Sequence, residues 1–316
     1  MSSGSSSGSD PDAISGPAPE PTSRTVSDGG LRLTVLGSGT LLPDRRHRSA
    51  AYLVEGGGRR CLVDCGAGTV HGFDEHGVAW QLLDAVVFSH YHTDHIGDLP
   101  ALLFALKHGV QPPRLKPLSI LGPPGLLVRL EAMAEAFGDH VEDPGFPLRT
   151  EEIGRRGSWQ FARSDEGSDP DEEALRVDFH PTPHTDESVA HRWQLGGHVI
   201  AYTGDTGPPD ADLVDFLSDV DVLIAETSLP DSTDMENHLT PSRVAALARD
   251  AEPGVLIPTH VYPQLGRDGL PGLLAGAGYE GRIEMGVDGL VVEIGIEGSS
   301  DAVWSEDGER IRIHRP

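Results

Sequence analysis

The stretch of sequence that decides the fold is SHYHTDH, residues 89–95. It contains three imidazoles and one carboxylate, the ligand types that borderline divalent metals prefer. It follows the apolar run DAVVFS (84–89), which is typical of a buried strand. Side chains on a loop that leaves the carboxyl end of a strand can point at two adjacent ions. The stretch therefore predicts a metal site at this point of the chain.

Strands and helices are expected on both sides of this stretch. Before it, LRLTVLGSG (31–39) has the alternating pattern of a half-buried strand, and two β-rich runs around Gly56–Gly58 predict an antiparallel hairpin. After it, two segments have the apolar spacing of amphipathic helices. The hairpin and helix runs are AAYLVEGG (50–57), RRCLVDCGAG (59–68), IGDLPALLFALKHG (96–109) and LLVRLEAMAEAFG (126–138).

The second half of the chain repeats this alternation. Residues 143–171 are rich in acidic residues and glycine and are predicted to form a surface loop. Thr240 is predicted to cap a helix. The predicted strands are ALRVDFHPTPH (174–184), HRWQLGGHVIAYTGD (191–205), VDVLIAET (220–227), GVLIPTH (254–260) and GRIEMGVDGLVVEIG (281–295), and the helices are DADLVDFLSD (210–219) and TPSRVAALARDA (240–251). Because strands followed by helices recur, we expect an α/β layered sandwich.

Composition divides the chain into a tail and one domain. Residues 1–29 are rich in Ser, Gly, Pro and Asp and almost free of large apolar side chains, so they are predicted to be disordered. The remainder, residues 30–316, is long enough to bury a sizeable core and is predicted to be a single domain.

The charge balance limits the partners that the chain can have. It carries 50 Asp and Glu residues against 24 Lys and Arg, for a formal net charge of −26. Attraction to polyanions needs positive potential at the protein surface. A large nucleic-acid footprint is therefore disfavoured, and RNA stays a candidate partner only through a local basic patch.

Cysteine usage and the N-terminus indicate a cytoplasmic protein. Cys61 and Cys65 are the two cysteines and belong to no paired framework. The sequence opens with no basic and apolar leader, and no apolar run approaches the roughly 18 residues that a membrane span requires. We therefore expect neither export nor a membrane partner.

Taken in order, the motifs resemble those of the metallo-β-lactamase superfamily, whose H-x-H-x-D-H string stands here at residues 90–95. The likeness covers residues 31–290 and is strongest to the ribonuclease Z branch with its neighbouring phosphodiesterases and arylsulfatases. The strings that indicate this branch are LGSGTLLP (36–43), LVDCGAGT (62–69), LGPPGL (121–126), YTGDTGP (202–208), ENHLTPSRVAALA (236–248) and PTHVYP (258–263). The resemblance implies a four-layer αββα sandwich with a di-metal site at one edge.

The resemblance also implies a set of metal ligands, with Asp205 bridging the two ions. A carboxylate between two cations lowers their mutual repulsion. Zn²⁺ is the expected ion, with Mn²⁺ and Fe²⁺ as alternatives. The implied ligands of the first ion are His90, His92 and a third histidine, and those of the second ion are Asp94, His95 and His260.

The third histidine has three candidates, which are His180, His184 and His191. His184 follows a strand-like run and begins a turn, as the other ligands do, whereas His180 would lie within the strand. We therefore predict His184 as the ligand.

Further residues are expected to act around the ions. The resemblance places His238 where it could donate a proton to the leaving group, and it suggests Glu226 as the partner that keeps His238 charged. Asp64 is predicted to hydrogen-bond ligand imidazoles without binding metal, and Cys65 to fill the core. Asp94 is expected to hold the nucleophilic water while it binds its ion.

These expectations predict a di-metal hydrolase that activates a bridging water to cleave a phosphodiester or related small ester. Only a short segment separates His184 from Asp205, whereas tRNA-processing relatives carry an RNA-gripping arm there, and no P-x-K-x-R-N loop stands near Pro43. Processing of tRNA 3′ ends is the first alternative, and hydrolysis of aryl sulfates, lactones or thioesters is the second. A metal-binding module without activity is the non-enzymatic alternative. Specificity is expected in loops 107–117, 143–172 and 261–275, and a homodimer is a further expectation.

Overall fold

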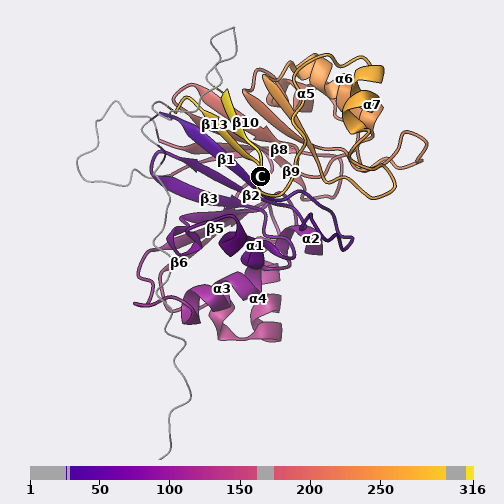
Figure 1. The fold of residues 1–316 in the computed structure, drawn as a ribbon. Coiled ribbons are helices and arrows are strands. Elements are labelled where there is room, and N and C mark those ends of the chain that lie inside the picture. The colour runs from indigo at the N-terminus through magenta and orange to yellow at the C-terminus, as the bar shows by residue number, and fades with distance from the viewer. Residues whose placement is uncertain (1–25, 27–28, 162–173, 297–310) are drawn as a thin grey trace, which may run out of the picture.

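The computed structural model describes residue 26 and residues 29–161, 174–296 and 311–316. The predicted tail, residues 1–29, lies almost wholly outside the described residues, so its disorder and the domain boundary stay predictions. Two mixed sheets form the centre of the described structure (Figure 1). The first has eight strands in the order β14-β13-β1-β2-β3-β4-β5-β6, and the second has six in the order β12-β11-β10-β9-β8-β7.

The elements follow the predicted alternation of strands and helices. The strands are β1 (Leu31–Gly37), β2 (Ala51–Gly56), β3 (Arg59–Val63), β4 (Ala85–Val87), β5 (Leu118–Gly122), β6 (Leu148–Glu152), β7 (Gly157–Gln160), β8 (Arg176–Pro181), β9 (Val189–Leu195), β10 (His198–Tyr202), β11 (Val222–Glu226), β12 (Val255–Thr259), β13 (Val291–Ile294) and β14 (Ile311–His314). The helices are α1 (Thr69–Glu75), α2 (Thr93–Ile96), α3 (Leu99–His108), α4 (Leu126–Phe137), α5 (Ala211–Leu217), α6 (Pro241–Ala251) and α7 (Leu270–Gly276), with 3₁₀ turns η1 (Trp80–Leu82) and η2 (Asp139–Val141).

Three apolar clusters define four layers. One lies between the two sheets and contains Trp193 of β9 together with alternate residues of β1. A second lies between the first sheet and helices α1, α3 and α4, and a third between the second sheet and helices α5, α6 and α7. Figure 1 shows these two helix groups on opposite sides of the sheets. The predicted αββα sandwich is thus confirmed.

Strand β1 shows why the sequence forms these layers. Leu31, Leu33 and Val35 are fully buried in the cluster between the sheets, while Arg32 and Thr34 face the other side. This is the period of two that a strand imposes on its side chains. Each such apolar side chain contributes about 1.5–3 kcal/mol when fully buried, which fixes the register of the strand.

Parts of the secondary structure differ from the predictions. The segment 143–171, predicted to be a loop, contains the strands β6 and β7. All of their residues are exposed or half-buried, so neither strand carries the clear apolar alternation that sequence patterns reveal. The segment 261–275, also predicted to be a loop, contains most of α7, which begins with Leu270 and a proline in its first turn.

The predicted cap of α6 is correct in position only. Thr240 occupies the N-cap position, but its side chain accepts no backbone N–H there. Its Oγ1 lies 3.4 Å from Ser242 Oγ instead. The helix start is therefore marked by Pro241 and the extended backbone of Thr240, and not by a capping box.

The direction of the strands determines where functional side chains gather. Strands β3 to β6 pair in parallel, and so do β10, β11 and β12. The carboxyl ends of parallel strands meet at one edge of a sheet, and loops that leave this edge can present side chains to a common site. In the described part of the chain, no helix has the length and apolarity needed to cross a bilayer.

Candidate metal centre

The histidine string is shaped by the end of β4 and the start of α2. His92 occupies the N-cap position of α2, so Asp94 and His95 fall in its first turn. The backbone N–H of Cys65 donates to the carbonyl of His95 (2.6 Å), which ties this turn to the end of β3. Gly66 is required here, because a Cβ at that position would lie 2.0 Å from the carbonyl oxygen of Asp94.

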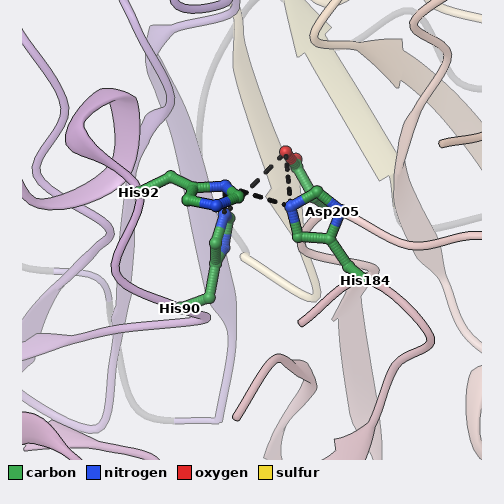
Figure 2. Close-up of side chains that lie close together, drawn as sticks. All are labelled: His90, His92, His184 and Asp205. Carbon is green, nitrogen blue, oxygen red and sulfur yellow. Dashed lines mark hydrogen bonds and ion pairs between the residues drawn. The ribbon is translucent and has the colours of Figure 1, made fainter. Parts of the chain in front are cut away.

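Four of the predicted ligands converge to form the first cluster, shown in Figure 2: His90, His92, His184 and Asp205. Their ligand atoms all lie within 4.8 Å of one another. The Nδ1 atom of His92 lies 3.1 Å from Nε2 of His90 and 3.1 Å from Nε2 of His184. Oδ2 of Asp205 lies 3.7 Å from Nε2 of His184 and 3.9 Å from that of His90.

The other predicted ligands form the second cluster, which consists of Asp94, His95 and His260. Nε2 of His260 lies 3.3 Å from Oδ2 of Asp94. Asp205 stands between the two clusters, since its Oδ1 is 3.5 Å from Nε2 of His95 and its Oδ2 is 3.6 Å from Nε2 of His260. All seven predicted ligands are therefore brought to one place.

The two clusters fit a pair of divalent ions. Nε2 of His95 and Oδ1 of Asp205 are buried and have no hydrogen-bond partner among the described residues, which is costly for polar atoms unless something binds them. Ligands about 2.0–2.1 Å from a tetrahedral ion are roughly 3.3 Å apart. The 3.1 Å separations among the imidazole nitrogens of the first cluster are close to that value.

The electrostatics of the site favour bound cations. Burial lowers the pKa of His90 well below its usual value, which keeps a neutral imidazole lone pair available. Burial would raise the pKa of Asp205, but His260 and His95 hold it well below its usual value, so Asp205 is a carboxylate. Burial likewise disfavours charge on His95, yet Asp205 and Asp64 raise its pKa well above normal. The carboxylates thus stabilise positive charge here.

Asp64 hydrogen-bonds one of the predicted ligands, His95, as expected from the sequence. It follows β3 with a left-handed φ of 55°, and it is completely buried. Its Oδ2 accepts hydrogen bonds from His95 Nδ1 (2.7 Å), from the Ser89 hydroxyl (2.8 Å) and from the Tyr202 hydroxyl (3.0 Å). A carboxylate on the far nitrogen of a ligand histidine fixes the tautomer that leaves the near nitrogen free for metal.

Two further histidines of the site, His184 and His260, are also held through Nδ1. His184 donates from Nδ1 to the carbonyl of Asn237 (2.8 Å), and Nδ1 of His260 lies 3.0 Å from the hydroxyl of Ser228. Both Nε2 atoms therefore face the clusters. His260 follows β12 directly and has a left-handed φ of 54°, a strained conformation for a residue with a Cβ.

His238 and Glu226 form the predicted pair beside the clusters. Nδ1 of His238 lies 3.0 and 3.1 Å from the two carboxylate oxygens of Glu226, which is the last residue of β11 and is completely buried. Burial disfavours charge on His238, but the hydrogen bond and the charge of Glu226 raise its pKa to about 9. His238 also groups with Asp205 and His260, so its ring borders the space between the clusters.

The two histidines that were not chosen as the third ligand, His180 and His191, lie away from the clusters. His180 is within β8, where its Nε2 contacts Arg156 (2.6 Å) and its ring packs on Phe216. His191 is completely buried in β9, and its Nε2 donates to the carbonyl of Phe88 (3.2 Å). Among the described residues, neither belongs to a cluster of potential ligands.

Three residues near the site had no predicted role. Tyr202 supports Asp64, Ser228 links Glu226 to His260, and the ring of Tyr262 lies 5.7 Å from that of His260. Tyr202 and Tyr262 lie within the strings YTGD and PTHVYP, which mark the family resemblance. However, no characteristic sequence spacing identifies a hydroxyl or a phenol as part of a site. Their roles follow from contacts between distant segments.

Comparison with known proteins agrees with the fold. Ribonuclease Z of Mycobacterium bovis (strain BCG / Pasteur 1173P2) is 29% identical over 297 residues, covering 84% of this chain and 98% of that protein. The metallo-β-lactamase fold protein YhfI from Bacillus subtilis has a TM-score of 0.66 at 24% identity, covering 84% and 99% of the two chains. The short form of human tRNase Z has a TM-score of 0.64 at 21% identity, with the same coverage.

These two solved structures share the fold with this chain. A family profile described as the β-lactamase superfamily domain matches residues 59–261, a segment that runs from β3 past β12 and contains every predicted metal ligand. This match spans more than half of the sequence. The chain therefore belongs to the β-lactamase superfamily, and it is a metal-dependent hydrolase of that superfamily.

Proposed function

We propose that this chain hydrolyses small phosphodiesters with two divalent ions, held by the first and second clusters with Asp205 between them. The observation that carries the proposal is the meeting of seven potential ligands, in two groups that share Asp205, beside the His238–Glu226 pair. Two ions with a general acid next to them suit a reaction in which a charged group is attacked and an alkoxide departs.

Divalent ions bound there would supply Lewis acidity that activates water and polarises the ester bond. The chain itself would supply orientation and proton transfer. The Asp94 carboxylate would hold the hydrogen of the attacking water, and Nε2 of His238 would protonate the leaving oxygen. Glu226 favours the imidazolium form of His238 and fixes its ring, because the carboxylate occupies Nδ1 and leaves Nε2 to face the site.

The segment between His184 and Asp205 supports a small substrate. It consists of a short turn, β9, a two-glycine turn at Gly196 and Gly197, and β10. All of β10 pairs with residues 191–195 of β9, so this segment has no room for the RNA-gripping arm expected there in tRNA-processing enzymes. The net charge of −26 also opposes the approach of a long polyanion.

Maturation of tRNA 3′ ends is the second candidate. Curated relatives named ribonuclease Z align with 84% of this chain and with nearly their whole length, which favours this activity. Sulfate esters, lactones and thioesters are further substrates that the same centre could support. An inactive metal-binding module is disfavoured, because none of the seven ligand positions has been lost.

A single panel of assays tests the proposal. Zinc-loaded protein is given bis-p-nitrophenyl phosphate, p-nitrophenyl sulfate, a homoserine lactone and a precursor tRNA, with His90→Ala as the inactive control. We expect the phosphodiester to have the highest kcat/KM and the His90 variant to lose that activity. Cleavage of the precursor tRNA far faster than every small ester would replace the proposal with the second candidate. Turnover that survives His90→Ala would contradict the metal-dependent reaction.

A further inference from the structure

Asp288 lies near the end of the described chain, yet it contacts the turn that follows β1. Strands β1 and β13 pair antiparallel, and Gly289 N donates to the carbonyl of Val35 (2.8 Å) just before β13 begins. This pairing carries the Asp288 side chain to Ser38, 250 residues away in sequence. Asp288 is buried, with an exposed fraction of 8%.

The carboxylate of Asp288 clamps both sides of this turn. Its Oδ1 accepts hydrogen bonds from the backbone N–H of Ser38 (2.9 Å) and from the Ser38 hydroxyl (2.8 Å). Its Oδ2 accepts from the backbone N–H of Arg48 (2.9 Å). Because Gly39 N donates to the carbonyl of Arg48 (2.7 Å), residues 37–39 are held against the segment that leads into β2. A Cβ at Gly37 would lie 1.8 Å from the carbonyl oxygen of Ser49, so the approach is close.

The other side of this turn contacts a predicted metal ligand. The carbonyl of Ser38 accepts the backbone N–H of His260 (2.9 Å) and a guanidinium N–H of Arg267 (2.7 Å), and the Thr259 hydroxyl lies 3.4 Å from it. His260 has the left-handed backbone described above, which is unfavourable for a residue with a Cβ. A conformation of this kind persists only where surrounding contacts determine it.

We propose that Asp288 is a positioning residue for His260. By fixing the Ser38 carbonyl, Asp288 holds His260 in the backbone conformation that directs its imidazole at Asp94 and Asp205. The inference rests on the proposed two-ion site, since it concerns how the second cluster is assembled. In this role Asp288 itself contacts neither substrate nor ions.

This role differs from general structural support in one measurable way. A carboxylate that only stabilises the fold would affect both clusters equally when it is replaced. A positioning residue for His260 affects the second cluster and spares the first, whose ligands lie on other loops. In Asp288→Asn, an amide N–H₂ must face donors from Ser38 or from Arg48, so one side of the clamp opens.

The test is zinc titration of the full chain against a chromophoric chelator, in two backgrounds. His90→Ala disables the first cluster and leaves the second, and His95→Ala does the reverse. Asp288→Asn is added to each. The matched control is Glu293→Gln, another carboxylate with an exposed fraction of 8%, which lies on β13 and is hydrogen-bonded by Arg32 instead of by the turn.

We expect Asp288→Asn to weaken zinc binding about 10- to 100-fold in the His90→Ala background, the range found when groups that orient ligands are removed. Binding in the His95→Ala background should be unchanged, and Glu293→Gln should leave both unchanged. Equal losses in the two backgrounds, or no loss in either, would overturn the inference. If Asp288→Asn does not fold, Ser38→Ala replaces it, because it removes one bond of the clamp. A several-fold loss confined to the second cluster supports the inference, and unchanged binding overturns it.

The zinc titration distinguishes failure of the proposed function from failure of the inference about Asp288. If the unmodified chain binds fewer than two zinc ions, the two-ion site itself is wrong, whatever Asp288 does. If it binds two and Asp288→Asn has no selective effect, only the inference about Asp288 fails.

Discussion

Replacing Glu226 with glutamine would show whether Glu226 acts on His238 by its position or by its negative charge. The substitution keeps the shape of the side chain and one oxygen that can accept from Thr206 N, which now lies 2.7 Å from Oε1. It removes the negative charge at 3.0–3.1 Å from Nδ1 of His238. Because Glu226 is completely buried, water does not replace that charge.

The expected magnitude follows from the pKa of His238. With a pKa of about 9, about 97% of the imidazole is protonated at pH 7.5, whereas at the ordinary value of 6.5 only about 9% is. Glu226→Gln should therefore lower a rate that depends on this acid by roughly tenfold at pH 7.5. Cations beside the ring lower the pKa in both proteins, so the difference between them is the quantity to compare.

The assay is the pH dependence of kcat/KM for two phosphodiesters. One has a p-nitrophenolate leaving group, which departs without a proton, and the other has an alkyl leaving group, which needs one. A general acid must be protonated to act, so activity falls as pH rises through its pKa. We expect the alkaline limb for the alkyl ester to move to lower pH in Glu226→Gln, while the p-nitrophenyl ester changes little.

The control is Glu236→Gln, which removes an exposed carboxylate two residues before His238. Its profiles should match those of the unmodified chain. Equal losses on both esters in Glu226→Gln, with an unmoved alkaline limb, would refute the assignment of His238 as the acid. They would indicate that Glu226 serves the fold or the ions.

Other predictions concern the ligands and their supports. His184→Ala should reduce zinc from two ions per chain to one, measured by elemental analysis, whereas His180→Ala should retain both. Asp64→Asn should weaken zinc binding about 10- to 100-fold in a chelator titration, because it loses the charged partner of His95 Nδ1. Burial would raise the pKa of Asp288, but His47, whose Nδ1 lies 3.7 Å from Oδ1, and hydrogen bonds from Arg48 and Ser38 hold that pKa below its usual value. Its stabilisation is thus complete above the unfolded pKa of about 3.9 and is lost as pH falls through the folded value. In urea melts with EDTA, the stability difference between the unmodified chain and Asp288→Asn should be constant from pH 7 to about 5 and should shrink below about 4.

The layers of the fold could be predicted because the core strands carry strong local patterns. β11 and β12 are completely buried and read as continuous apolar runs, and β1 alternates clearly. The strands β6 and β7 carry exposed polar residues, and their pairing depends on β5 and β8. Their existence is therefore set by tertiary contacts, which a local pattern does not contain.

Some residues of the candidate site could likewise be predicted from the sequence, and others could not. Histidines and aspartates at strand ends have a chemistry and spacing that indicate metal, and this is why His184 could be chosen over His180. Of the groups that orient them, Asp64 could be predicted because it closes the apolar strand CLVD, whereas Ser228 and Asp288 have no such signal. Ser228 is an ordinary hydroxyl until β11 and β12 pair, and Asp288 acquires its contacts only when β13 joins β1. Such partners are specified by topology and not by motif.

The positions of the ions test the two-metal site most directly. Crystals of the zinc-loaded protein, measured on both sides of the zinc absorption edge, would locate each ion by its anomalous signal. We predict two peaks per chain, one among His90, His92, His184 and Asp205 and the other among Asp94, His95, His260 and Asp205. A single peak, or peaks that lie away from Asp205, would contradict the shared centre on which the proposed reaction depends.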